Sequence, residues 1–368
     1  MLIRNLILQI SKTGYQIARP FIFLQSAQSA HEQTLKLLNI LDKTPVSFLR
    51  LVHTLTFRHM PVTVGKVDLP HPFILAAGFV KGLGFETEQQ ALRAVRDGVN
   101  IIPGWRAIPG LVGAVEFGSF TRYPRVGNSG TVIWRDSASQ STQNRVGLKN
   151  PGAVAAAAFL YQNRKSCPKQ FGINIAPSPG VDDPVDVVEA IGAFLSRGIR
   201  PSWFTLNLSC PNTEDDPENR QTETLTKALC GAAMDYLNEQ VAGSIPLWVK
   251  ISPNLSYSQL DVLMKVFHDL GIAAVIATNT LTQPIPDNAT IQGGVGGGKL
   301  YPYALSTVAK LAKIKQEKNY PIDIIACGGI QDPLTYIAYA QHGVKAYQYW
   351  SALVYRGPLA AALILNEI

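Results

Sequence analysis

The sequence predicts a (β/α)8 barrel preceded by a small N-terminal helical extension, and three observations favour this fold. The chain has 368 residues, enough for one barrel of about 250 residues and an appendage. From residue 61 onward, short apolar runs alternate with amphipathic segments, as strands and helices do around a parallel sheet. Glycine and polar residues follow the apolar runs, and no linker interrupts the alternation. A doubly wound sheet is the alternative.

The apolar runs and the segments between them define the expected elements. We expect barrel strands at 73–77, 114–120, 171–175, 203–208, 247–251, 274–277, 322–326 and 346–350. We expect helices at 86–97, 186–196, 223–241, 258–270, 305–316 and 333–342. The barrel domain is therefore placed at residues 61–368 and the extension at residues 1–60.

The extension is predicted to contain two short amphipathic helices. Residues 1–11 carry their apolar side chains on one helical face, and Ser29 with Glu32 matches a capping box that opens a second helix. The first apolar stretch is too short to span a bilayer. Two interpretations stay open: the helices pack on the barrel as a cap, or residues 1–24 lie on a membrane surface.

Composition excludes several classes of protein. The cysteines lie far apart with no CxxC pair, and the histidines are scattered, so we expect neither a disulfide scaffold nor a metal site. This cysteine usage indicates a reducing, cytoplasmic compartment. The net charge of +7 suits an anionic ligand. Since the sequence contains no run of five or six basic residues, no nucleic acid partner is expected.

The segment 205–213 is predicted to be a buried strand that ends in a loop at Pro211. Its end gathers a thiol, Cys210, beside the carboxamides of Asn207 and Asn212. Such groups can orient a polar ligand around a proton acceptor. The alternative is a cysteine that is buried as a small hydrophobic residue.

Two lysines are candidates for binding an anionic group. Lys250 lies within an apolar strand, where a charged amine is costly unless an anion or a dipole receives it. Alternatively, its side chain extends to solvent. Lys81 lies between glycines in a loop and could contact a carboxylate or a cofactor, although an exposed lysine is the ordinary expectation for such a position taken alone.

The last two strands are followed by glycine-rich segments. A run of glycines at 293–298 precedes a helix, Gly328 and Gly329 end the seventh strand, and Ser351 follows the eighth. Backbone N–H groups in such turns can bind a phosphate, and barrels place this site after strands seven and eight. We therefore expect a phosphate site at these turns.

Seven short motifs in the same order make the chain resemble the dihydroorotate dehydrogenases, flavin barrels that oxidise dihydroorotate to orotate. The likeness runs from about Pro20 to the C-terminus. The motifs occupy residues 75–78, 144–148, 172–175, 207–213, 249–251, 277–280 and 328–330.

The resemblance implies FMN as cofactor and assigns a role to each site residue. Cys210 would take the C5 proton while hydride passes from C6 to flavin N5, and Lys250 would stabilise charge on the reduced ring. The FMN phosphate would lie near Gly297, Gly328, Gly329, Ser351 and Ala352. The ring would contact Ala77, Gly78, Ser119, Asn174, Asn207, Lys250 and Thr278. Substrate would be held by Lys81, Asn144, Gly147, Leu148, Asn212, Asn279 and Thr280.

The likeness to the subclasses is mixed. The helical extension resembles the membrane-associated, quinone-reducing class, which implies quinone as oxidant and peripheral contact with the inner face of the cell membrane. That class uses serine as base, whereas Cys210 resembles the soluble classes. Two alternatives stay open: an FMN-dependent reductase of another pyrimidine or an RNA base, and a non-catalytic flavin-binding barrel. Departures from the family pattern are Val80, Gly296, Trp350, Ala352, residues 214–216 and an insertion at 100–113.

Overall fold

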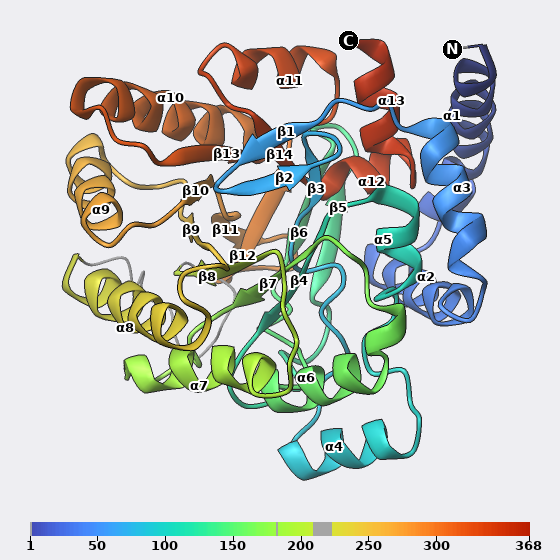
Figure 1. Ribbon diagram of the computed structural model, residues 1–368. Coiled ribbons are helices and arrows are strands. Elements are labelled where there is room, and N and C mark those ends of the chain that lie inside the picture. The colour runs from blue at the N-terminus through green and yellow to red at the C-terminus, as the bar shows by residue number, and fades with distance from the viewer. Residues whose placement is uncertain (1, 182, 209–222) are drawn as a thin grey trace.

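A computed structural model describes residues 2–181, 183–208 and 223–368 and shows a closed barrel of eight parallel strands (Figure 1). The order around the barrel is β10-β13-β14-β3-β4-β7-β8-β9. This closure confirms the predicted fold and rules out a doubly wound sheet. Each strand overlaps one predicted segment: β3 (Phe73–Leu75), β4 (Val115–Phe120), β7 (Phe171–Ile175), β8 (Trp203–Asn207), β9 (Leu247–Ile251), β10 (Ala274–Ala277), β13 (Asp323–Cys327) and β14 (Ala346–Tyr349).

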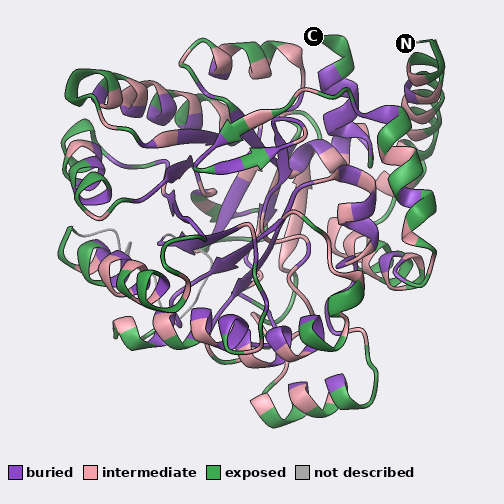
Figure 2. Ribbon diagram, viewed as in Figure 1, coloured by how far each residue is buried: buried purple, intermediate pink, exposed green. Residues whose placement is uncertain are grey.

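Helices surround the barrel, so its strands are buried on both faces, as Figure 2 shows. Side-chain caps begin four of them, at Thr87, Asp183, Ser256 and Asp332. Helix α6 was not predicted because apolar residues cover all its faces, which hides the amphipathic pattern. The helices are α4 (Glu88–Arg96), α5 (Ala107–Val112), α6 (Ala153–Gln162), α7 (Pro184–Leu195), α8 (Glu223–Val241), α9 (Tyr257–Asp269), α10 (Tyr301–Lys318), α11 (Pro333–Ala340), α12 (Ser351–Arg356), α13 (Ala360–Glu367) and the 3-10 turn Arg164–Ser166.

A hairpin of β1 (Val62–Val64) and β2 (Val67–Leu69) lies at the amino ends of the barrel strands. Its turn contacts the indole of Trp248, whose Nε1 donates to the carbonyl of Gly65 at 3.0 Å. A Cβ at Gly65 would lie 2.3 Å from that nitrogen, and its φ is +52°, so the turn requires glycine. Trp248 stacks on Trp203 at a centroid distance of 4.4 Å. Two stacked indoles and a hairpin therefore fill this end of the barrel.

A four-stranded antiparallel sheet, ordered β11-β12-β6-β5, extends from the opposite end. It consists of β5 (Ile133–Asp136), β6 (Ser141–Asn144), β11 (Leu281–Ile285) and β12 (Asn288–Gly297). The glycine run at 293–298 was expected to form a loop, but this expectation is wrong, because residues 293–297 form the end of β12. Glycine suits this central strand, since a Cβ at Gly293 would lie 3.0 Å from the carbonyl oxygen of Asn144.

The N-terminal extension contains three helices instead of the expected two: α1 (Leu2–Phe23), α2 (Ala27–Leu41) and α3 (Val46–Thr56). Helix α1 is longer than expected and continues through Pro20. The capping box expected at Ser29 is wrong, because Ser26 is the N-cap and accepts a hydrogen bond from the Ser29 backbone at 3.1 Å. No helix in the described ranges is long and apolar enough to span a bilayer.

Helix α1 packs against the C-terminal helices of the barrel. The hydroxyl of Tyr15 donates to the carbonyl of Val354 at 2.7 Å, and Arg19 donates to the carbonyl of Tyr355 at 2.9 Å. The guanidinium of Arg135, on β5, lies 3.9 Å from the ring centroid of Phe23 and fixes the end of α1. The extension is therefore a cap on the barrel in this structure.

Candidate active site

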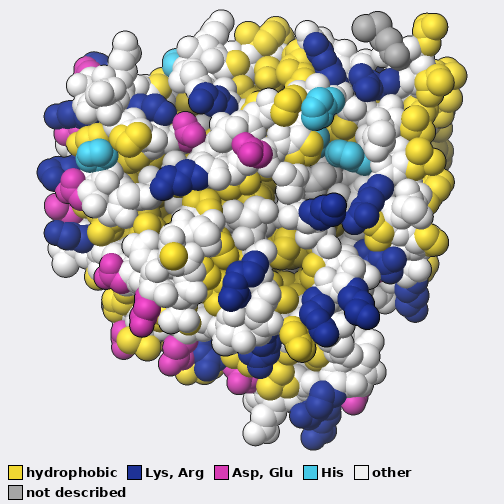
Figure 3. All heavy atoms as spheres, in the orientation of Figure 1, with side chains coloured by type: hydrophobic (Ala, Val, Ile, Leu, Met, Phe, Trp, Pro, Cys, Tyr) yellow, Lys and Arg dark blue, Asp and Glu magenta, His cyan; other side chains and the backbone are white. Residues whose placement is uncertain are grey.

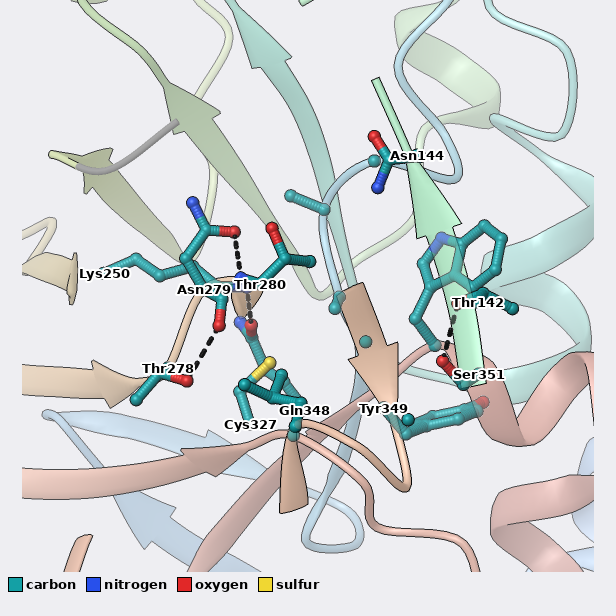
Figure 4. Close-up of a pocket in the computed structure, with 18 of the residues that line it drawn as sticks. Thr142, Asn144, Lys250, Thr278, Asn279, Thr280, Cys327, Gln348, Tyr349 and Ser351 are labelled. Atoms are coloured by element: carbon teal, nitrogen blue, oxygen red, sulfur yellow. Dashed lines mark hydrogen bonds between the residues drawn. The ribbon is translucent and has the colours of Figure 1, made fainter. Parts of the chain in front are cut away.

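One cavity at the carboxyl ends of the barrel strands is lined by every predicted site residue that the structure describes (Figure 4). These residues come from distant parts of the chain and meet because the carboxyl ends of parallel strands share one mouth of a barrel. The roles assigned to them stay predictions. Cys210 and Asn212 lie outside the described residues. The lining residues are Ala77, Gly78, Lys81, Ser119, Asn144, Gly147, Leu148, Asn174, Asn207, Lys250, Thr278, Asn279, Thr280, Gly297, Gly328, Gly329, Ser351 and Ala352.

The Lys250 side chain points into the barrel mouth, so the alternative in which it extends to solvent is wrong. The residue is 5% exposed, and its Nζ donates to Gln348 Oε1 at 3.0 Å. Gln348 in turn donates through Nε2 to Glu116 Oε2 at 2.9 Å. Burial raises the pKa of the neighbouring Cys327 thiol, opposed by the charge of Lys250 and its hydrogen bond. A cation is therefore fixed at the cavity floor beside a neutral thiol.

Carboxamides and hydroxyls line the next part of the cavity. Asn207 donates through Nδ2 to Ser119 Oγ and accepts from Asn279 Nδ2, both at 3.2 Å. The Asn279 Oδ1 accepts from the backbone of Thr280 at 2.9 Å, and Thr278 donates to the Asn279 carbonyl at 2.8 Å. Figure 4 shows Thr278, Asn279 and Thr280 together on one side of the cavity. This network holds donors and acceptors in fixed positions around a polar ligand.

Glycines and two hydroxyls form the other side. A Cβ at Gly329 would lie 2.5 Å from the Cβ of Tyr301 and 2.8 Å from the carbonyl of Gly297, so these turns pack too closely for larger residues. The hydroxyls of Thr142 and Ser351 lie 2.9 Å apart and face each other in Figure 4. Backbone N–H groups and hydroxyls in such an arrangement suit a phosphate.

Several buried polar atoms at the cavity have no hydrogen-bond partner among the described residues. A buried polar group without a partner is costly, so each one indicates a position where a ligand atom is expected. The atoms are Asn174 Oδ1, Thr280 Oγ1 and Gln331 Oε1.

Sequence reasoning missed functional candidates of two kinds. Glu116 and Gln348 are polar residues within apolar strands, which is the same signal that identified Lys250. His31, by contrast, reaches the cavity from α2, and no local pattern indicates which cavity a helix will border. Burial, reinforced by the positive charges of Lys81 and Lys149, lowers the pKa of His31 to about 4. Its imidazole is therefore neutral near pH 7.

A closed barrel with polar groups at the carboxyl ends of its strands and glycine turns after the last two is the architecture of barrel enzymes that bind a phosphate-bearing ligand. The family model described as dihydroorotate dehydrogenase matches residues 59–368. The chain belongs to this family, which confirms the resemblance.

Similar proteins cover nearly the whole chain. A protein of Chloroflexus aurantiacus named dihydroorotate dehydrogenase (quinone) is 30% identical over 95% of this chain and 94% of its own. One of Nitrosomonas eutropha with the same name is 30% identical over 96% of both chains. The crystal structure of the Eimeria tenella DHODH in complex with ferulenol shares the fold, with a TM-score of 0.72 and 21% identity over 93% of this chain and 90% of that one.

Proposed function

We propose that this protein oxidises dihydroorotate to orotate, a step of pyrimidine biosynthesis, with FMN as cofactor and a quinone as electron acceptor. The observation that carries the proposal is the convergence of a buried lysine, a carboxamide network and glycine turns on one cavity in a chain of this family. The relatives that cover the chain are named for dihydroorotate and quinone.

The cavity fits FMN. The tight glycine turns and the hydroxyl of Ser351 suit its phosphate, and Ala352 completes that end of the cavity. The buried Lys250 ammonium suits a polar ring with both donors and acceptors, as does the Asn174 oxygen, which has no partner in the part of the chain that the structure describes. Bound FMN supplies a two-electron acceptor for hydride. The other residues that would contact the ring are Ala77, Gly78, Ser119, Asn207 and Thr278.

The substrate would lie between the carboxamide network and the loop that carries Lys81. Asn144, Asn279 and Thr280 offer donors and acceptors that match a pyrimidinedione edge, and Lys81 suits the carboxylate. Gly147 and Leu148 complete the wall on this side. A thiolate at Cys210 would remove the substrate proton, with Asn212 beside it; both positions lie outside the described residues.

The electron acceptor would enter between the barrel and the N-terminal helices. His31 and the indole of Trp350 line the cavity at this side. Helix α1 carries an apolar stripe on its exposed face: Ile3, Leu6 and Ile10 are 66%, 61% and 63% exposed. Figure 3 shows hydrophobic side chains in a column along the edge where α1 lies. Residues 1–24 would therefore rest on the membrane that contains the quinone.

Anaerobic titration of the purified protein with dihydroorotate tests this function. The flavin absorbance is expected to bleach and to recover on addition of a quinone. An unchanged flavin spectrum with dihydroorotate, combined with reduction by another dihydropyrimidine, would assign a different substrate. Cys210→Ala should abolish flavin reduction by dihydroorotate, and turnover equal to that of the natural chain would exclude the proposed base.

A further inference from the structure

A buried carboxylate, Glu116, lies below the cavity floor. It is the second residue of β4 and is 0% exposed. Its Oε1 accepts a hydrogen bond from Asn174 Nδ2 at 2.6 Å. Its Oε2 accepts from Gln348 Nε2 at 2.9 Å, Thr205 Oγ1 at 2.8 Å and Trp203 Nε1 at 3.1 Å. Since a buried carboxylate is costly unless it is hydrogen-bonded, these four donors hold Glu116 in one orientation.

Glu116 determines which end of each carboxamide points toward the cavity. A carboxylate only accepts hydrogen bonds, so Asn174 and Gln348 must both turn their NH2 groups toward it. The Asn174 oxygen is then left buried and without a partner among the described residues. The Gln348 oxygen is left to accept from Lys250 Nζ at 3.0 Å. The cavity floor therefore presents an acceptor oxygen and a fixed ammonium.

We propose that Glu116 is a positioning residue for the cofactor ring, acting through Asn174 and Gln348. This inference rests on the proposed function, because it concerns FMN bound in this cavity. The oxidised isoalloxazine edge carries an N–H donor beside carbonyl acceptors, so an outward Asn174 oxygen and the Lys250 ammonium match it in chemistry. The negative charge of Glu116 also offsets the buried charge of Lys250 through the bridging amide.

The variant Glu116→Gln tests the orientation directly, because it changes one oxygen into a donor while keeping the shape. Three donors converge on Oε2 of Glu116 and one on Oε1. The amide of the variant is therefore expected to place its oxygen at the Oε2 position, where it still accepts three hydrogen bonds, and its NH2 group at the Oε1 position, facing Asn174. Asn174 then rotates and presents its own NH2 to the cavity. The dissociation constant of FMN is expected to rise by about tenfold or more, with a shifted absorption spectrum of the bound flavin.

A second substitution should restore binding. In the natural chain Asn174 Nδ2 lies 2.6 Å from Glu116 Oε1. Asn174→Asp alone brings two carboxylates together at this contact, so it too should weaken FMN binding. In Glu116→Gln with Asn174→Asp, the Gln amide donates to one Asp oxygen, and the other Asp oxygen is again an acceptor facing the cavity. The double variant is therefore expected to bind FMN within about threefold of the natural chain, because the two effects are coupled.

Asp42 provides the matched control, because it is also buried and accepts four hydrogen bonds far from the cavity. Asp42→Asn should lower the melting temperature and leave FMN affinity unchanged. The donors to Asp42 are Asn100 Nδ2 at 2.8 Å, and the backbones of Gly104 at 2.7 Å, Arg106 at 3.2 Å and Ala107 at 2.9 Å.

FMN affinity is measured by quenching of flavin fluorescence on adding the flavin-free full chain, with melting temperatures recorded in parallel. A folded Glu116→Gln variant with the FMN affinity of the natural chain would overturn the inference. A double variant would also overturn it if its loss of FMN binding free energy equals the sum of the losses in the two single variants. If Glu116→Gln does not fold, the FMN affinities of Asn174→Asp and the double variant are compared. Tighter binding by the double variant supports the inference, and equal or weaker binding overturns it. A natural chain that binds no FMN refutes the proposed function itself, and this result is seen before any variant is compared.

Discussion

The imidazole of His31, on α2, lies 6.4 Å from the indole of Trp350, which follows β14 at the other end of the chain. Phe79 contacts both, with centroid distances of 6.2 Å to His31 and 5.9 Å to Trp350. The N-terminal extension thus contributes a wall to a cavity that is otherwise built by the barrel. This contact places α2 beside the proposed flavin site.

Replacing Trp350 by Ser should impair reaction with the acceptor more than reaction with the substrate. The change removes aromatic surface at the side where the quinone is proposed to enter, so we expect the KM for quinone to rise about fivefold. The rate of flavin reduction by dihydroorotate should stay within about twofold, since Trp350 takes no part in the hydrogen bonds of the carboxamide network. Stopped-flow measurement of the two half-reactions separates these effects.

Trp134→Ser is the control for this prediction. The Trp134 indole lies on β5 and donates to Asp287 Oδ2 at 2.7 Å, on the outer part of the accessory sheet. Its loss should change neither half-reaction. A Trp350→Ser variant with slowed flavin reduction and a normal KM for quinone would contradict the proposed entrance.

Lys250→Met should slow flavin reduction by about 100-fold or more, because the fixed ammonium at the cavity floor is lost while the side-chain volume is kept. The Gln348 oxygen loses its donor, which costs about 1 to 3 kcal/mol of stability. Rapid-mixing reduction by dihydroorotate and urea unfolding measure the two effects. Reduction at the natural rate in a flavin-loaded Lys250→Met variant would exclude a role for this cation.

The barrel strands could be predicted because they are short apolar runs buried on both faces, which is a local property. The accessory sheet could not, because β12 pairs with β6 across a long sequence separation and its glycines are typical of a loop. The register that brings Gly294 opposite Asn144 is set by the barrel, and no local pattern contains it.

The described site residues could be predicted because the family motifs fall at strand ends, and a barrel brings strand ends together. What the sequence could not supply is the direction of each side chain. Asn174 was predicted to contact the ring, but the orientation of its amide follows from Glu116, which no motif contains. His31 faces the cavity only because α2 docks beside Trp350.

The buried His71 should make the fold less stable in mild acid. Burial, with the adjacent His53, lowers the pKa of His71 to about 3, below its ordinary value of about 6.5. The unfolded chain therefore takes up a proton that the folded chain excludes, and stability is lost as pH falls from about 6.5 toward about 3. Between about pH 8 and pH 5 this loss is about 2 kcal/mol from His71 alone.

In the natural chain the rings of His71 and Phe57 stack with their centroids 4.5 Å apart. His71→Phe keeps an aromatic ring in this stack and should remove the loss of stability in acid that comes from His71. Urea midpoints of the natural chain and the variant at about pH 8 and pH 5 measure it, and His59→Gln, a change at an exposed position, is the control. An equal drop in the free energy of unfolding for natural chain and variant would show that His71 is not an acid-sensitive group.

Changing Ile3, Leu6 and Ile10 together to Gln should weaken binding to anionic lipid vesicles by about 100-fold. These side chains are 66%, 61% and 63% exposed, and inserting the exposed part of each contributes about 1 kcal/mol. Because they pack little against the barrel, the melting temperature should not change. Vesicle co-sedimentation and thermal unfolding are the measurements.

The matched control changes three exposed apolar residues on the outer barrel helices, Val262, Leu334 and Ile337, to Gln. It removes a similar kind of surface away from α1, so vesicle binding should stay at the natural level. The α1 variant should still reduce a short, water-soluble quinone at the natural rate and lose activity only with a long-tailed quinone in vesicles, because the cavity is unaltered. Natural vesicle binding by the α1 variant would show that another surface meets the lipid.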